Sequence, residues 1–190
     1  MVPFQKTLTE YCPFDAEEEM NKARILALFE ETDIPFSREN LSGHITGSAL
    51  VVNADLTKTC LIKHKKLGMW LQPGGHCDGD PEVDQTALRE TEEETGLKEL
   101  RLIPRIFDVD VHDIPEREKG GLVEPAHYHH DIRYLVVANE EEQATIQEEE
   151  IDGLQWMSFE EAVKINPWRP FSRMIDKLMS ERELYLSWIK

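Results

Sequence analysis

The order of helical and extended patterns predicts an α+β fold, in which strands surround one central helix and further helices lie at both ends. Three observations support this prediction. Short runs of apolar and β-branched residues lie on both sides of a single amphipathic stretch near the middle of the 190-residue chain. These runs do not alternate regularly with helical patterns, as the strands of a doubly wound parallel sheet would. The length suits one domain with its own core.

The first helix is predicted from Ala16 to Thr32, where apolar residues recur at intervals of three and four. Asp15 precedes this stretch, and its side chain can cap the free amides of a helix N-terminus. Pro35 and the polar residues after it break the helical pattern. We therefore expect residues 1–40 to form a helical extension of the main domain.

The strands of the core are predicted from extended patterns bounded by turn residues. We expect a hairpin, then a short strand that stops at Pro73-Gly74-Gly75, then longer strands after the central helix. The segment between the two longest strands is rich in proline, glycine and charge, so we expect a loop there. The predicted strands are Ser48 to Asn53, Lys58 to His64, Trp70 to Gln72, Leu100 to Val111, Asp131 to Ala138 and Leu154 to Met157.

Helices are also predicted at the end of the chain, a short one from Phe159 to Val163 and a longer one from Pro170 to Trp188. The chain is thus expected to form a single domain over residues 1–190. Its core should span residues 43–163, and residues 164–190 should provide a C-terminal helix.

The charge balance is strongly acidic, with 38 acidic and 21 basic residues and a formal net charge of −17. Such a field repels nucleic-acid backbones and anionic membranes, so we expect neither as a partner. It would also repel a small phosphorylated substrate, unless cations gather where the acids cluster. Cys12, Cys60 and Cys77 lack paired spacing, which favours reduced thiols in the cytosol. With no signal-peptide pattern and no apolar run near the roughly 20 residues of a membrane span, a cytoplasmic protein is expected.

The central helix is predicted from Pro81 to Thr95. Asp80 can cap its N-terminus, proline suits the first helical position, and Gly96 is the left-handed residue that often ends a helix. Its inward face is predicted by a stripe spaced by three or four residues, consisting of Val83, Ala87, Leu88 and Thr91.

Four glutamates crowd the last turn and a half of this helix, which is where the helix dipole disfavours negative charge. Glu90 is three and four residues from Glu93 and Glu94, so these carboxylates share one face and repel each other by a few tenths of a kcal/mol per pair. Either this face is simply solvated or it holds a cation. The preceding Gly74-Gly75 allows the backbone to approach a ligand, and clustered oxygen donors suit Mg²⁺ or Mn²⁺.

This stretch resembles the Nudix box, the signature of the Nudix hydrolases. The box begins with a glycine, matched by Gly75, and its core R-E-(apolar)-x-E-E-x-G-(apolar) is matched by Arg89-Glu90-Thr91-Glu92-Glu93-Glu94-Thr95-Gly96-Leu97. Trp70 to His76 and Glu150 to Ala162 also resemble the segments that lead into the box and close the domain. Two positions depart from the signature, since Pro81 stands where an early glutamate is usual and Thr91 occupies an apolar position.

The resemblance covers roughly Gly43 to Val163 and implies an α/β/α sandwich around a mixed sheet, here with an added N-terminal helix and a C-terminal helix. It implies that Glu90, Glu93 and Glu94 bind Mg²⁺ or Mn²⁺ and that Arg89 orients a glutamate. The implied activity is metal-dependent hydrolysis of a diphosphate bond in a nucleoside diphosphate linked to another moiety, or in a related metabolite. Glu93 and Glu150 are alternative general bases, although Glu150 could equally be one of several solvated acids. A homodimer is a further expectation, since dimers are frequent among similar proteins.

Histidines form a second constellation. His127 and His129 lie on the same side of a strand together with Asp131. Imidazoles with a carboxylate suit a transition metal, and they could also donate hydrogen bonds to a substrate phosphate. The candidate second metal site comprises His76, His112, His127, His129 and Asp131. The candidate substrate-binding residues are Gly74, Gly75, His76, His127 and His129. His44 and His64 are expected to be structural, and the histidine segments could also lie apart with no ligand.

Two other functions are compatible with the pattern. Isopentenyl diphosphate isomerase has a similar fold and a metal site of histidine and glutamate, although the complete Arg89-Glu90…Glu93-Glu94 core favours a hydrolase. A non-catalytic nucleotide-sensing domain on the same scaffold would be expected to lack some of the carboxylates, and none is missing. Binding without turnover would favour this third interpretation.

Overall fold

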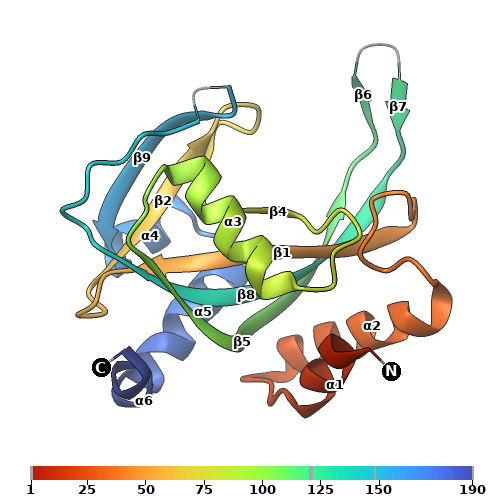
Figure 1. Ribbon diagram of the computed structural model, residues 1–190, viewed down its shortest axis with the longest axis horizontal. Helices are drawn as coiled ribbons and strands as arrows, with labels where there is room; N and C mark the ends of the chain where they lie inside the picture. The colour runs from red at the N-terminus through yellow and green to blue at the C-terminus, as the bar shows by residue number, and fades with distance from the viewer. Residues whose placement is uncertain (1, 120–121, 148, 190) are drawn as a thin grey trace.

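The computed structural model describes residues 2–119, 122–147 and 149–189, and it contains a mixed sheet with helices on both faces (Figure 1). Seven strands of the described residues form this sheet. Its main path runs β3-β2-β1-β8-β5, while β4 pairs with β1 and β9 pairs with β2. The strands are β1 Gly43–Val52, β2 Lys58–His64, β3 Met69–Leu71, β4 Gly74–His76, β5 Leu100–Ile114, β8 His127–Ala138 and β9 Ile151–Ser158.

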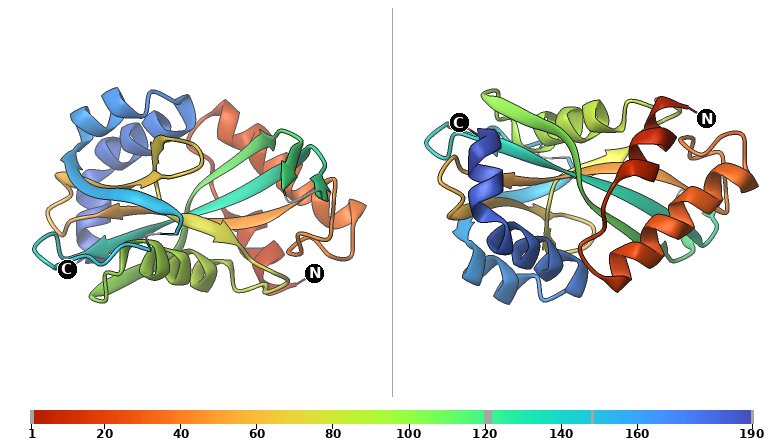
Figure 2. Two further views of the ribbon diagram at one scale, coloured as in Figure 1. Left: turned by 90° about the horizontal axis from the view of Figure 1, so that it is seen from above. Right: turned by 90° about the horizontal axis from the view of Figure 1, so that it is seen from below.

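The helices cover two faces and one edge of the sheet. They are α1 Pro3–Glu10, α2 Ala16–Glu31, α3 Val83–Thr95, α4 Phe159–Ile165, α5 Arg169–Ser180 and α6 Arg182–Ile189. Figure 2 shows α3 on one side of the sheet and α4 to α6 on the other. The predicted α+β sandwich around a mixed sheet is therefore confirmed. No helix of the described residues combines the length and apolar character that a membrane span needs.

The central strands β1 and β8 run parallel, in register from Gly43 opposite Tyr128 to Val52 opposite Val137, whereas the other pairs of the main sheet are antiparallel. Every residue of β1 is buried, as expected for a central strand covered on both faces. Because successive side chains point to opposite faces, the strand supplies two separate cores.

The first core lies between the sheet and α1, α2 and α3, and the second between the sheet and α4, α5 and α6. Ile45 and Ala49 of β1 belong to the first core, and Leu50 and Val52 belong to the second. The inner faces of the C-terminal helices contribute Phe159, Ala162, Phe171, Met174, Ile175, Leu178, Tyr185 and Ile189.

The helix α2 lies beside β5, the edge strand of the sheet (Figure 1). Asp15 caps it as predicted, accepting a hydrogen bond from Glu18 N (2.9 Å). The carboxylate of Glu18 accepts from Val109 N (3.3 Å), and the hydroxyl of Tyr11 donates to Phe107 O (3.1 Å). Side chains of the extension thus bind backbone groups on the outer side of the edge strand.

Several predicted boundaries were wrong. The first helix α1 was missed, although Phe4 and Leu8 of this helix are buried. The predicted loop after β5 is instead a continuation of both long strands, which extend to Ile114 and from His127. Between them, β6 Arg117–Lys119 and β7 Leu122–Glu124 pair as a projecting hairpin (Figure 1). Residues 120–121 of that segment lie outside the described residues.

The other differences concern where strands and helices begin and end. The strand predicted to stop at Pro73-Gly74-Gly75 is followed at once by β4, which includes Gly74 and Gly75 and pairs with β1. The helix α3 begins at Val83, so neither Asp80 nor Pro81 occupies its predicted position; Asp80 accepts a hydrogen bond from Glu82 N (2.9 Å), before the helix starts. The predicted C-terminal helix is divided into α5 and α6, because the non-helical backbone at Glu181 separates them.

Candidate functional site

The acidic helix α3 is held directly against β1 because Gly47 has no side chain. A Cβ at Gly47 would lie 2.7 Å from Val83 O and 3.1 Å from Ala87 N. The predicted inward residues Val83, Ala87 and Thr91 are buried, while Leu88 is half-buried. Thr91 fits its apolar position because its hydroxyl donates to Ala87 O (2.7 Å). This packing fixes the height of the glutamates above the sheet.

The three candidate metal ligands lie at different depths on α3. Glu94 is only 6% exposed, and its Oε2 accepts a hydrogen bond from Gly74 N (2.9 Å). The carboxylate of Glu90 lies against Gly75, where an added Cβ would be 2.5 Å from Glu90 Cδ. Glu93 is exposed. The double glycine therefore contacts two of the three carboxylates, and a side chain at Gly75 would fill the space that Glu90 occupies.

Arg89 connects two of these glutamates with the neighbouring strand. Its Nη1 lies 2.7 Å from Glu90 Oε1 and 3.3 Å from Glu93 Oε2, and its Nη2 donates to His76 O (3.1 Å). Although Arg89 lies at mid-helix, it thus reaches the acidic turn and partly neutralises it. Arg89 supplies one positive charge, whereas Glu90, Glu93 and Glu94 together carry three carboxylates.

The electrostatics of this surface reflect that excess of negative charge. Burial raises the pKa of Glu94 to about 8, although the hydrogen bond from Gly74 lowers it. The negative charges of Glu90, Glu150 and Glu93 raise it further. Burial also raises the pKa of Glu90 despite the adjacent guanidinium. A cation at this surface would offset both effects.

Glu150 reaches the same region from a distant part of the sequence. It immediately precedes β9, and its carbonyl accepts from Lys65 N (2.8 Å). Its carboxylate lies 3.8 Å from Lys66 Nζ and is about half exposed. Because its charge acts on Glu94, the fold brings this acid within electrostatic range of the carboxylates on α3.

Five of the histidines gather on the opposite face of the sheet. His44 of β1 and His112 of β5 are both in register with His129 of β8. The ring centroid of His129 lies 5.0 Å from those of His44 and His76, 5.2 Å from that of His127 and 5.6 Å from that of His112. Five imidazoles from four strands therefore form one cluster. His76 joins it because it opposes Thr46 on β1.

The structure places His44 at the centre of this cluster, whereas the sequence interpretation treated it as structural. The alternation of His44, Thr46 and Ser48 in an otherwise apolar strand was the available signal. This alternation could not show which residues lie beside His44. The parallel pairing of β1 with β8 brings together residues that are 85 positions apart in the sequence, such as Thr46 and Asp131.

Asp131 shares the strand face of the histidines, but its oxygens have other partners. They accept from Thr46 Oγ1 (3.0 Å), Ser48 Oγ (2.8 Å) and Arg133 Nε (2.8 Å). Its carboxylate thus belongs to a buried polar network beside the imidazoles.

That network contains two buried arginines. Arg133 lies 3.0 Å from both Asp108 and Asp110, and Arg173 of α5 lies 2.9 Å from Asp108. Although burial acts in the opposite direction, Arg133 holds the pKa of Asp110 well below its usual range. Asp110 also contacts His112 Nδ1 (3.1 Å), which connects the network with the histidine cluster. Nothing in the sequence pattern had indicated this network.

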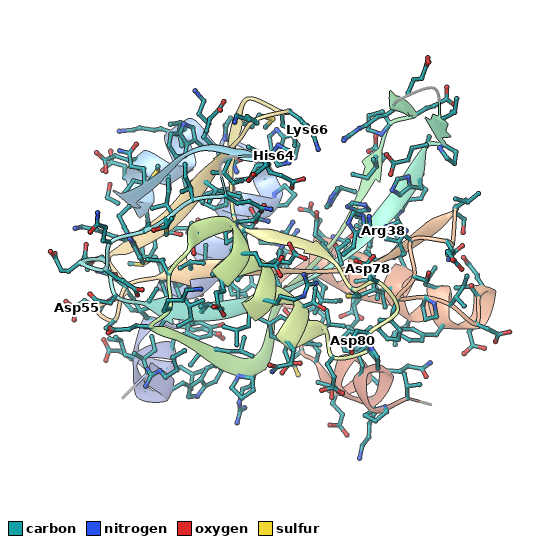
Figure 3. The ribbon with its side chains drawn as sticks, turned by 45° about the horizontal axis from the view of Figure 1, so that its top comes forward. Arg38, Asp55, His64, Lys66, Asp78 and Asp80 are labelled. Carbon is teal, nitrogen blue, oxygen red and sulfur yellow. The ribbon has the colours of Figure 1, made fainter. Side chains whose placement is uncertain are left out.

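Burial keeps several of the imidazoles neutral at pH 7. It lowers the pKa of His129 to about 2 and that of His76 to about 4, and neighbouring imidazoles lower both further. Burial likewise lowers the pKa of His44. Arg38 also lowers the pKa of His76; Figure 3 shows Arg38 next to Asp78, with which it forms hydrogen bonds of 2.6 and 2.8 Å. Neutral imidazoles carry the lone pair that a metal requires.

The short strand β4 separates the carboxylates from the imidazoles. Gly75 opposes Gly47, and both glycines contact α3. The next residue, His76, points to the other face, towards the cluster. The two candidate sites are therefore adjacent in the sequence but lie on opposite faces of the β1–β4 pair.

Comparisons with known proteins agree with this architecture. Residues 44–178 match the family model of the NUDIX domain. A probable DHNTP pyrophosphohydrolase of Lactococcus lactis subsp. cremoris is 32% identical over 128 residues, which are 67% of this chain and 74% of that protein. The m7GpppN-mRNA hydrolase NUDT17 of Homo sapiens is 27% identical over 164 residues; the match includes 78% of this chain but spans only 45% of the human protein. The crystal structure of a C. elegans Ap4A hydrolase binary complex has a similar fold, with a TM-score of 0.54, 18% identity, and coverage of 72% of this chain and 95% of that one.

Proposed function

The chain belongs to the Nudix family of hydrolases, and we propose that it cleaves a diphosphate bond in a nucleoside diphosphate linked to another moiety, or in a related small phosphorylated metabolite. We further propose that Mg²⁺ or Mn²⁺ is required and that Glu90, Glu93 and Glu94 hold it. The observation that carries the proposal is the contact between the double glycine and two buried or half-buried carboxylates on one helix face.

The residues present fit a hard divalent cation. All three side chains offer carboxylate oxygens, the donors that Mg²⁺ and Mn²⁺ prefer. The raised pKa values of Glu90 and Glu94 show that the protein alone leaves their negative charge poorly compensated. When bound, such an ion supplies neutralisation of the diphosphate oxygens and makes water a stronger acid.

The side chains of this chain would then position and deprotonate the attacking water. Its oxygen forms a new bond to phosphorus while the bridging P–O bond breaks, giving two phosphorylated products. A carboxylate accepts the proton that the water loses. Glu93 and Glu150 are the candidates for this role, since one is exposed on α3 and the other acts on Glu94 from the neighbouring segment. Arg89 orients Glu90 and Glu93 through its charge-assisted contacts.

The substrate is proposed to bind along β4, with Gly74 and Gly75 beside the reacting diphosphate. His76, His127 and His129 were also predicted to bind the substrate, but they lie on the opposite face of the β1–β4 pair and are left out of this proposal. The two curated relatives are by name hydrolases of DHNTP and of m7GpppN-mRNA. The strongly acidic charge of this chain disfavours a long nucleic acid, so a small molecule is the proposed substrate.

A hydrolysis screen, read by chromatographic separation of the phosphorylated products, tests the proposal. The panel contains nucleoside diphosphate sugars, dinucleoside polyphosphates, ADP-ribose, nucleoside triphosphates and DHNTP, each with Mg²⁺ or Mn²⁺ and with a chelator as control. We expect hydrolysis that stops when the chelator is added. Isopentenyl diphosphate belongs in the panel and is read for isomer. Isomer formation without hydrolysis, or nucleotide binding without turnover, would contradict the proposal.

Single substitutions test the site itself. Glu90→Gln, Glu93→Gln and Glu94→Gln should each reduce turnover by at least about 100-fold, since each removes a charged donor from the reacting centre. Glu92→Gln is the matched control, because Glu92 lies on the same helix but pairs with Lys98 (2.7 Å). Comparison of Glu93→Gln with Glu150→Gln identifies the general base. The variant that lacks the general base should lose the rise of the rate with pH on the acidic limb of the pH–rate profile, and the other variant should keep it. The proposed homodimer is tested by light scattering in solution.

A further inference from the structure

We propose that His44, His127 and His129 form a binding site for a transition-metal ion such as Zn²⁺, separate from the carboxylates of α3. One ligand nitrogen from each of these side chains lies within 4.8 Å of the others. The inference concerns a different face of the sheet and does not depend on the proposed hydrolysis.

The backbone holds these side chains in fixed positions. His44 and His129 are direct partners in the parallel β1–β8 ladder, which continues in register to Val52 and Val137. His127 lies two residues before His129, on the same face of β8. Ring centroids of the three imidazoles are 5.0 to 5.2 Å apart.

Hydrogen bonds fix which nitrogen of two of these rings carries the proton. His127 Nδ1 lies 2.8 Å from Pro125 O, and His44 Nδ1 lies 3.4 Å from Asn40 O. A carbonyl oxygen only accepts, so each Nδ1 is the donor, and each Nε2 is left to offer its lone pair. Histidine ligands of metals usually have such a partner on the other ring nitrogen, which orients the ring and fixes the tautomer.

The lone pairs have no partner in the protein. The Nε2 atoms of His44, His127 and His129 are all buried and accept no hydrogen bond from any of the described residues. His44 is 3% exposed and His127 is 6% exposed, so contact with bulk solvent is slight. Buried polar atoms without partners are uncommon and cost free energy. Coordination of one ion would satisfy all three.

The donor type selects the ion. Imidazole nitrogens favour Zn²⁺ and related transition metals, whereas the carboxylates of α3 favour Mg²⁺ and Mn²⁺. Three protein ligands leave the fourth position of a tetrahedral Zn²⁺ site open. His76 and His112 are the nearest further imidazoles, with centroids 5.0 and 5.6 Å from that of His129. Asp131 is engaged by Thr46, Ser48 and Arg133, so it is left out of the proposed ligand set.

The experiment is a titration of the untagged, chelator-treated full chain with Co²⁺, followed by visible absorption, and then displacement by Zn²⁺. We expect one Co²⁺ per chain, retained in the presence of millimolar Mg²⁺. His127→Asn and His129→Asn should each weaken binding by more than about 100-fold, since loss of an outer-shell partner alone costs roughly 10- to 100-fold. His64→Asn is the matched control, because His64 lies on β2, whereas the clustered histidines lie on β1, β4, β5 and β8.

Two further measurements keep the test decisive. Glu93→Gln and Glu94→Gln should retain Co²⁺ binding, and its loss in these variants would place the ion at α3 and overturn the proposal. If the histidine variants fail to fold, nitrogen-15 spectra of the unmodified protein provide the answer. Saturating Zn²⁺ should then shift the Nε2 signals of His44, His127 and His129. Unchanged signals, or no binding at micromolar Zn²⁺, would also overturn it.

Discussion

Replacing Gly75 with alanine should displace Glu90 while leaving the backbone in place. The φ of Gly75 is not positive, so alanine can adopt its conformation. The new Cβ would lie 2.5 Å from Glu90 Cδ and 2.6 and 2.7 Å from the two carboxylate oxygens. An ordinary contact of 3.4 Å therefore requires the carboxylate to move by about 0.9 Å.

The two consequences differ in size. The displaced group is the end of a flexible, partly exposed side chain, so the free energy of unfolding should fall by only about 1 kcal/mol, the lower limit for overpacking. A shift of about 1 Å at a reacting centre can reduce the rate by roughly 100-fold. We therefore expect kcat for diphosphate hydrolysis to fall by about that factor, with weaker Mg²⁺ binding and nearly unchanged Tm.

Two other glycines provide controls for this variant. Gly153→Ala should change neither rate nor Tm, because its Cβ would have only ordinary contacts of 3.7 and 4.0 Å. Gly74→Ala should reduce both, because its Cβ would lie 2.3 Å from Ser48 Cβ inside the β1–β4 pair. Normal kcat and Mg²⁺ affinity in Gly75→Ala would refute the reasoning, and so would a loss of activity that only follows the loss of folded protein.

Three further predictions concern acidity, reactivity and stability. The pKa of Glu94 is about 8 in the folded chain without metal, against an ordinary 4.5, so between these pH values the folded state retains a proton that the unfolded state has lost. Stability of the metal-free protein should therefore fall as pH rises through this window, and Mg²⁺ affinity measured by calorimetry should rise; Glu94→Gln should flatten both trends. Burial raises the thiol pKa of Cys60 and Cys77 to about 12, so a thiol reagent at pH 8 should modify only the exposed Cys12 before unfolding and all three after it. Arg173→Met removes one of the two guanidiniums that pair with the buried Asp108, which leaves the negative charge of the network poorly compensated, and should cost about 3–5 kcal/mol, a fall in Tm on the order of 10 °C.

Each of these has an outcome that would count against it. Equal Mg²⁺ affinity at pH 6 and pH 8 would remove the argument for a protonated Glu94. Rapid modification of all three thiols in the native protein would contradict their burial. For the arginine, the matched control is Arg169→Met, which breaks only ion pairs with partly or fully exposed groups; an equal fall in Tm in both variants would show that the buried network is not special.

Local chemistry made much of the fold predictable. Asp15 caps α2 and Gly96 ends α3 in the left-handed conformation, because each signal acts within one turn of helix. The hairpin of β1 and β2 and the closing strand β9 followed equally from short patterns. The start of α3 was predicted two residues too early. Asp80 and Pro81 are residue types that favour a helix N-terminus, but here they lie in the turn before the helix.

The unpredicted parts of the site depend on contacts between distant residues. His44 joins the cluster only through the register of β1 with β8, and no spacing within the chain encodes that register. Arg89 was expected to orient a glutamate, but its hydrogen bond to His76 O depends on the pairing of β4 with β1, which no local pattern indicated. Glu150 was predicted as a candidate general base, but the effect of its charge on Glu94 depends on how the segment before β9 returns towards α3.

The helix α2 covers the edge of β5, and this cover also bears on how the protein avoids the addition of strands from other molecules at that edge. Glu18 and Tyr11 occupy backbone groups of Val109 and Phe107 that would otherwise be open to pairing. An uncovered edge is a template on which strands of other molecules can add. The N-terminal extension therefore serves as a shield, and a chain shortened by residues 1–40 is expected to aggregate through β5 even if its remaining core folds.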